Sequence, residues 1–62
     1  MTYRLWELRT AKGYSLRALE ELSGVSKTEI NDIENGKTNP TIETLQLLAT
    51  ALEVKLSDLF TV

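Results

Sequence analysis

The sequence predicts an all-α fold, a compact bundle of five short helices. Apolar residues recur at spacings of three and four in four separate segments, which is the period of an amphipathic helix. Serine or threonine precedes each expected helix, and three of the helices are followed by glycine. Alternation of apolar and polar residues, which would indicate a half-buried strand, is not found. These signals place helices throughout the chain and predict no sheet.

Length and composition limit how such a bundle can be stabilised. The chain has 62 residues, which we expect to form one domain over 1–62. Neither cysteine nor histidine occurs, which excludes disulfides and the usual zinc sites. We therefore expect tight helical packing and a partner subunit to supply the stability. The net charge of −2 argues against indiscriminate attraction to nucleic acid.

The same composition bears on localisation and on chemistry. No apolar run approaches the ~18 residues that a membrane-spanning helix needs, and charges interrupt the segment where a signal peptide would be apolar. We expect a cytoplasmic protein that does not bind membranes. The chain also lacks a glycine-rich phosphate loop and the nucleophile and base pairs of common enzymes. We expect no enzyme activity, no metal, no cofactor and no small-molecule ligand.

The first helix is expected over Tyr3–Lys12, with Thr2 as its N-cap and Gly13 as its end. Leu5 begins its inner face. Trp6 lies off that face, so it covers the edge of the core or, alternatively, contacts a second subunit.

Two short helices joined by a tight turn are expected between Ser15 and Gly36. Ser15 and Ser26 are the predicted N-caps, because a hydroxyl oxygen at this position accepts a bond from an unpaired backbone N–H. Gly24 lies where the first of these helices must end. So short a glycine-containing turn makes the helices cross steeply, which is the geometry of a helix-turn-helix motif. The expected inner residues are Leu16, Leu19, Leu22, Val25, Ile30 and Ile33.

The second helix of the motif has a polar outer face. That face consists of Thr28, Asn31, Asp32 and Asn35, with Lys27 beside it at the helix start. Such residues could read base edges in a major groove. An ordinary solvated face has the same composition, and the helix alone does not separate the two interpretations.

The fourth helix is expected from the cap Thr41 to about Leu52, after the turn signal Asn39-Pro40. Its predicted buried residues are Ile42, Leu45, Leu48, Ala49 and Leu52. Leu47 lies outside this stripe. Ser57 is expected to cap a last helical turn over 58–60 that closes the core.

From about Leu5 to Phe60 the sequence resembles the Cro/repressor-type (Xre-type, lambda-repressor-like) helix-turn-helix regulators. The resemblance rests on LWELRTAKGYS, on LSGVSKTEINDIENGKTNPTIETLQLLATALEV and on LSDLF, in that order. It implies five α-helices, the second and third of which bind DNA. It also implies that Arg9 pairs with Glu34, a fork that would tie the first helix to the end of the third.

Residues of the DNA interface follow from the same resemblance. Family members present the third helix to the major groove. The implied base contacts are Lys27, Thr28, Asn31 and Asp32. The implied phosphate contacts are Arg17, Ser26, Asn35, Lys37 and Thr38, together with backbone N–H groups around Gly36.

Three residues depart from the family pattern. Leu16 replaces the usual glutamine at the start of the second helix, and Glu20 replaces a small residue that faces the third helix. We expect Glu20 to snorkel, to pair with a cation or to push the helices apart. Glu53 replaces a glycine at an expected left-handed position, at a cost of about 1 kcal/mol.

The leading hypothesis is a sequence-specific DNA-binding transcriptional regulator. Repression is favoured over activation, and the partner is a pseudo-palindromic operator bound by a homodimer, since few cations support a monomer. Predicted dimer contacts are Trp6, Leu47, Val54, Phe60 and Val62. The alternative is a protein-interaction or adaptor module on the same fold, with weak or no DNA binding.

Overall fold

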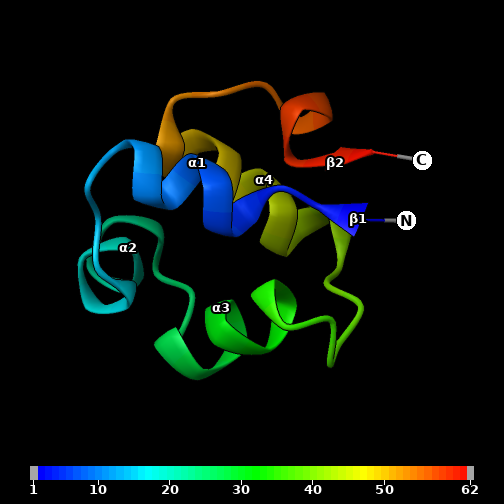
Figure 1. The fold of residues 1–62 in the computed structure, drawn as a ribbon, viewed down its shortest axis with the longest axis horizontal. Coiled ribbons are helices and arrows are strands. Elements are labelled where there is room, and N and C mark those ends of the chain that lie inside the picture. Colours follow the sequence, from blue (N-terminus) through cyan, green and yellow to red (C-terminus); the bar gives the residue numbers. More distant parts are fainter. Residues whose placement is uncertain (1, 62) are drawn as a thin grey trace.

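Four α-helices and a short 3-10 helix make up most of the structure (Figure 1). The computed structural model describes residues 2–61. The elements in chain order are β1 (Thr2–Tyr3), α1 (Leu5–Ala11), α2 (Leu16–Ser23), α3 (Lys27–Glu34), α4 (Ile42–Leu52), η1 (Leu56–Leu59) and β2 (Phe60–Thr61). The predicted all-α class is confirmed, although the structure has four α-helices and not five. Within residues 2–61, no helix has the length and apolar character needed to cross a membrane.

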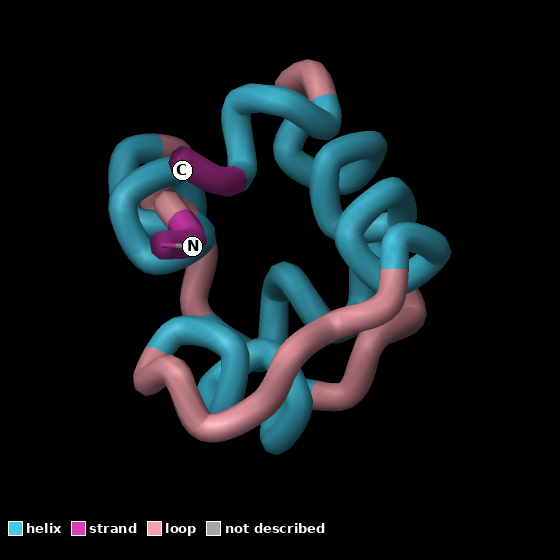
Figure 2. The backbone as a smooth tube through the Cα atoms, turned by 90° about the vertical axis from the view of Figure 1, so that its right-hand side faces the viewer, coloured by secondary structure: helices cyan, strands magenta, loops and turns pink. Residues whose placement is uncertain are grey.

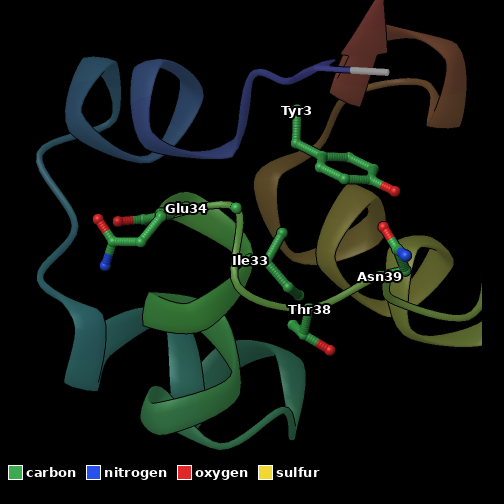
Figure 3. A pocket seen from close by; sticks show the side chains of 7 residues that line it. Tyr3, Ile33, Glu34, Thr38 and Asn39 are labelled. Carbon is green, nitrogen blue, oxygen red and sulfur yellow. The ribbon is translucent and has the colours of Figure 1, made fainter.

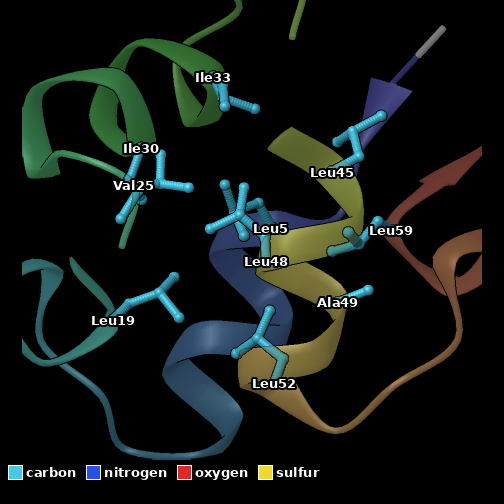
Figure 4. Packing of buried hydrophobic residues seen from close by; sticks show 10 residues of the cluster. All are labelled: Leu5, Leu19, Val25, Ile30, Ile33, Leu45, Leu48, Ala49, Leu52 and Leu59. Atoms are coloured by element: carbon cyan, nitrogen blue, oxygen red, sulfur yellow. The ribbon is translucent and has the colours of Figure 1, made fainter. Parts of the chain in front are cut away.

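The core lies where α1, α2, α3 and α4 converge, and η1 covers one side of α4 (Figure 4). Its buried apolar residues are Leu5, Leu19, Val25, Ile30, Ile33, Leu45, Leu48, Ala49, Leu52 and Leu59. Every helix and the turn between α2 and α3 contribute at least one of them. The helix-turn-helix is therefore held from behind by α1 and α4.

The predicted N-caps of α2, α3 and α4 are confirmed. The Ser15 hydroxyl accepts from the backbone N–H of Ala18 at 3.0 Å. The Ser26 hydroxyl does the same for Glu29 at 3.2 Å, and Thr41 for Thr44 at 3.1 Å. Each hydroxyl satisfies a donor that has no partner inside its own helix.

Helices α2 and α4 each end at a residue in the left-handed conformation, with positive φ. Gly24 has φ 79° and accomplishes the reversal between α2 and α3. Glu53 has φ 59° and ψ 40°, as predicted for this position. The N–H groups of Glu53 and Val54 donate to the carbonyls of Thr50 (3.2 Å) and Ala49 (3.0 Å), a Schellman-type ending. A residue with a Cβ therefore occupies a conformation that glycine adopts more easily.

The predicted start of the first helix is wrong by two residues. Thr2 and Tyr3 form β1, which pairs antiparallel with β2 through Tyr3 and Phe60 (Figure 2). The backbone N–H of Arg4 donates to the Leu59 carbonyl at 2.6 Å, and α1 begins only after it, at Leu5. The two ends of the described chain thus meet. This pairing depends on a contact between distant segments, which no local pattern reveals.

The expected fifth helix is a single 3-10 turn. Its N-cap is Lys55, and Ser57 lies inside the turn, which corrects the predicted cap. The Asp58 carboxylate accepts from the Lys55 backbone N–H at 3.1 Å and thereby closes the turn. Phe60 belongs to β2.

Two residues predicted for the core are exposed instead. Leu22 is 56% exposed and Ile42 is 65% exposed. A spacing of three advances about 300° around a helix, so the series through Leu19 drifts by about 60° a step and leaves the buried face at Leu22. Ser23, four residues after Leu19, is buried in its place. Ile42 is the first residue of α4, and Leu45 is the first buried residue of that helix. Ile42 therefore lies about one turn beyond the buried part of α4, measured along the helix axis.

Candidate nucleic-acid interface

The polar outer face of α3 is exposed along one edge of the molecule, and α1 and α4 lie on its inner side (Figure 1). Ile30 and Ile33 are fully buried, which fixes how the helix is rotated. Of the predicted base contacts, Lys27, Thr28 and Asn31 are exposed, whereas Asp32 is half-buried. The structure therefore brings these four residues to one side of a helix whose opposite side is packed into the core.

The start of α3 is anchored by Glu20 of α2. A Glu20 carboxylate oxygen accepts from the backbone N–H of Lys27 at 3.0 Å. Beside it, Ser26 accepts from Glu29, so two of the first N–H groups of α3 have acceptors within the protein. The carboxylate also lies at the positive end of the helix dipole, where negative charge is favourable.

Glu20 makes a contact that the sequence did not predict, and none of the ion pairs found in residues 2–61 includes it. Its carboxylate binds the backbone of the neighbouring helix, and the half-buried side chain bridges α2 and α3 directly. This bond depends on how α2 and α3 pack across the turn, so no local sequence rule predicts it.

The end of α3 is tied to α1 by Arg9 and Glu34. Arg9 Nε donates to Glu34 Oε2 at 2.6 Å, and Nη2 donates to Oε1 at 3.1 Å. A third donor, Nη1, reaches the Tyr14 carbonyl at 2.8 Å. The side chains are 11% and 5% exposed. The predicted ion pair is present, with the parallel two-bond geometry in which an arginine–carboxylate pair is strongest.

The loop after α3 offers fewer backbone donors than predicted. The N–H groups of Asn35, Gly36 and Lys37 donate to the carbonyls of Asn31, Ile33 and Asp32, respectively. These three groups are engaged within the protein and are not turned toward a phosphate. The exposed side chains of Lys37 and Thr38 are the loop's remaining predicted phosphate contacts.

A hollow of about 340 Å³ lies between β1 and this loop (Figure 3). It is lined by Tyr3, Ile33, Glu34, Asn35, Gly36, Thr38 and Asn39. The Tyr3 ring is directed toward Asn39 across it. Sequence reasoning missed Tyr3 and Asn39 because the hollow depends on the β1–β2 pairing that carries Tyr3 to this place.

Charge on the candidate interface is mixed. Lys27 and Lys37 are exposed cations. Arg17 is exposed too, but its guanidinium lies 3.5 Å from the Glu21 carboxylate one turn away. Among the residues described, no group of three acidic, histidine or cysteine side chains is arranged to hold a metal ion.

The predicted dimer contacts differ in how much of each side chain is exposed. Trp6 and Leu47 are exposed, which corrects the expectation that Trp6 covers the core edge. Val54 and Phe60 are half-buried and pack against the core. Val62 lies outside the described residues.

A family model described as helix-turn-helix matches residues 7–59. The chain belongs to this helix-turn-helix family. The resemblance to Xre-type regulators is thereby confirmed. The family comprises DNA-binding transcriptional regulators and is not a family of enzymes.

Similar proteins carry the same fold. The chain is 45% identical over 53 residues to the HTH-type transcriptional regulator SlrR of Bacillus subtilis, covering 84% of this chain and 35% of SlrR. It matches the restriction-modification controller protein C.AhdI of Aeromonas hydrophila with a TM-score of 0.88 and 42% identity, over 92% of this chain and 86% of that one. It also matches SinR, a master regulator for biofilm formation solved in complex with DNA, with a TM-score of 0.81 and 40% identity, over 87% of each chain. The chain spans about a third of the length of SlrR.

Proposed function

We propose that the chain is a sequence-specific DNA-binding domain of a transcriptional regulator and inserts α3 into the major groove. The observation that carries the proposal is the fixation of α3 at both ends, by Glu20 at its start and by Arg9 at its end. A rigid helix with a polar exposed face is what direct readout of base edges requires. The similarity to DNA-bound SinR supports the same conclusion.

In this proposal the outer face reads bases and the flanks contact phosphates. Lys27, Thr28, Asn31 and Asp32 are the base-contacting residues. A carboxylate such as Asp32 accepts from the cytosine amino group, so Asp32 favours cytosine at one position of the site. The phosphate contacts are the side chains of Arg17, Ser26, Lys37 and Thr38.

Two copies of the chain acting as a homodimer would double these contacts. One copy offers few cations to phosphates, and a symmetric pair matches a pseudo-palindromic operator. The exposed apolar side chains of Trp6 and Leu47, with Val54, Phe60 and Val62, are the proposed contacts between copies. Residues 1–62 would then act as one cytoplasmic domain that represses by covering a promoter.

Selection from a pool of random DNA duplexes tests the proposal. At low salt, the chain should enrich one sequence, and a recovered palindrome would report the symmetry and the half-site spacing together. Failure to enrich any sequence would overturn the proposed function.

The exposed Trp6 and Leu47 also favour the alternative of an adaptor that binds another protein. Salt dependence separates the two functions. Binding to DNA should weaken steeply between about 50 and 200 mM salt, because counterions are released from phosphates, whereas apolar binding to a protein should not.

A further inference from the structure

Two exposed asparagines one turn apart on α3 are joined through their side chains. Asn35 Nδ2 donates to the backbone carbonyl of Asn31 at 2.9 Å and to the side-chain oxygen Oδ1 of Asn31 at 3.1 Å. Hydrogen bonds between side chains four residues apart are a regular feature of helix surfaces. Here one of the two partners is a proposed base contact.

These two bonds determine which way both amides face. A backbone carbonyl can only accept, so the atom of Asn35 that meets it must be Nδ2. The same Nδ2 meets the side chain of Asn31, so the Asn31 atom facing it must be the acceptor Oδ1. The Asn31 Nδ2 group, with two N–H donors, consequently lies on the side of that amide away from Asn35.

We propose that Asn35 is a positioning residue that orients the Asn31 amide and thereby sets the base preference of α3. The inference rests on the proposed function. Asn31 Nδ2 can donate to N7 of a purine, while the second lone pair of Oδ1 accepts from the N6 amino group of adenine. Because Asn35 already holds the amide in this orientation, Asn31 loses less side-chain freedom on binding.

Asn35 is less well suited to contact a phosphate itself. Its Nδ2 carries two hydrogens, and the two bonds to Asn31 match that number. Its backbone N–H donates to the Asn31 carbonyl. The side-chain atom left over is an oxygen, which accepts and would repel a phosphate oxygen. On this geometry we assign Asn35 the positioning role in place of the phosphate contact that the family resemblance implies.

The position allows a clean substitution. Asn35 has φ −94° and ψ 4°, a conformation with negative φ that does not require glycine or asparagine, and its side chain is exposed. Asn35→Ala should therefore fold like the original chain, which circular dichroism can verify.

The test measures binding to the duplex selected from the random pool and to its single-base-pair variants. The original chain should prefer adenine at one position by about tenfold. Asn35→Ala should lose most of that preference, while its affinity for unrelated duplex DNA and its salt dependence stay unchanged. Asn31→Ala should lose the same preference, and the double substitution should lose no more. Lys55→Ala, an exposed residue beside η1 and outside the proposed interface, is the control and should retain it.

Two results would overturn the inference. One is uniform weakening of Asn35→Ala on every duplex with a shallower salt dependence, which indicates a direct phosphate contact. The other is an additive loss in the double substitution, which indicates that Asn35 does not act through Asn31. In both cases the original chain still shows sequence preference, so the proposed function survives. A chain that prefers no sequence at all would overturn the proposed function and this inference together.

Discussion

Arg9 and Glu34 join the first and third helices through two parallel hydrogen bonds of 2.6 and 3.1 Å. The residues are 25 positions apart in the chain, and both side chains are largely removed from water. The third donor of Arg9 holds the Tyr14 carbonyl, just before α2 begins. One guanidinium thus links α1, the start of α2 and the end of α3. We therefore expect its loss to destabilise the whole helix-turn-helix motif.

Arg9→Ala should strongly lower the free energy of unfolding. Removing one partner of a buried pair leaves the other charge without compensation, which costs roughly 3–5 kcal/mol. In a domain of this size that corresponds to a fall in melting temperature of more than about 10 °C. Thermal unfolding followed by circular dichroism measures it.

Arg17→Ala is the control for this prediction. Arg17 is exposed and pairs with Glu21 on its own helix, an arrangement worth about 0.3–0.5 kcal/mol. Equal melting temperatures for the two variants would show that the Arg9–Glu34 pair does not stabilise the fold.

Glu53→Gly should raise stability. Glu53 ends α4 in a left-handed conformation that costs a residue with a Cβ about 1 kcal/mol or more. Glycine removes this strain but also removes the 3.2 Å ion pair with Lys12, whose exposed geometry is worth less than about 1 kcal/mol. Urea unfolding should therefore shift to higher midpoint concentration.

The Lys12 contribution can be separated by making the same change in a Lys12→Ala background. There the ion pair is already absent, so the gain from Glu53→Gly should be larger. A loss of stability in both backgrounds would contradict the strain at Glu53.

Glu20→Ala should destabilise the helix-turn-helix by about 1 kcal/mol, the typical value of a side-chain cap. The reason is the loss of the 3.0 Å bond to the Lys27 backbone N–H across the α2–α3 turn. Glu20→Gln keeps an acceptor and should lose less. The comparison variant is Glu21→Ala, next along the chain, whose exposed pairing with Arg17 contributes little. If Glu20→Ala and Glu21→Ala unfold at the same urea concentration, the cap contributes nothing.

Local signals predicted most of the fold, because they act within one turn. The sequence predicts the caps Ser15, Ser26 and Thr41 correctly, because a hydroxyl oxygen before a helix accepts from a backbone N–H of its first turn. The same rule fails at Thr2 and Ser57, which lie in β1 and inside η1. The family resemblance supplied the Arg9–Glu34 pair, which no periodicity could reveal across 25 residues.

The errors have two causes, namely contacts that form only in the assembled chain and a helical spacing that leaves the buried face. The β1–β2 pairing joins opposite ends of the described chain, and Leu22 is exposed because a spacing of three drifts off the buried face. In the candidate interface, the backbone groups around Gly36 were expected to meet phosphates. In the structure these N–H groups donate instead to carbonyls of α3, because the helix ends in a tight turn. The sequence predicts the end of the helix at Gly36 but not these hydrogen bonds.

Lys37→Ala should weaken DNA binding equally on all sequences. Lys37 is exposed in the loop after α3, where its ammonium can meet a phosphate, and phosphate contacts carry no base information. Removing one such contact should reduce the slope of log affinity against log salt by about 1 for each bound copy of the chain. Lys55→Ala is the matched control, because Lys55 is an exposed lysine beside η1 and away from α3. Fluorescence polarisation over a salt series measures both variants. Equal slopes for Lys37→Ala and Lys55→Ala would remove Lys37 from the interface, and a loss confined to one base pair would make it a base contact instead.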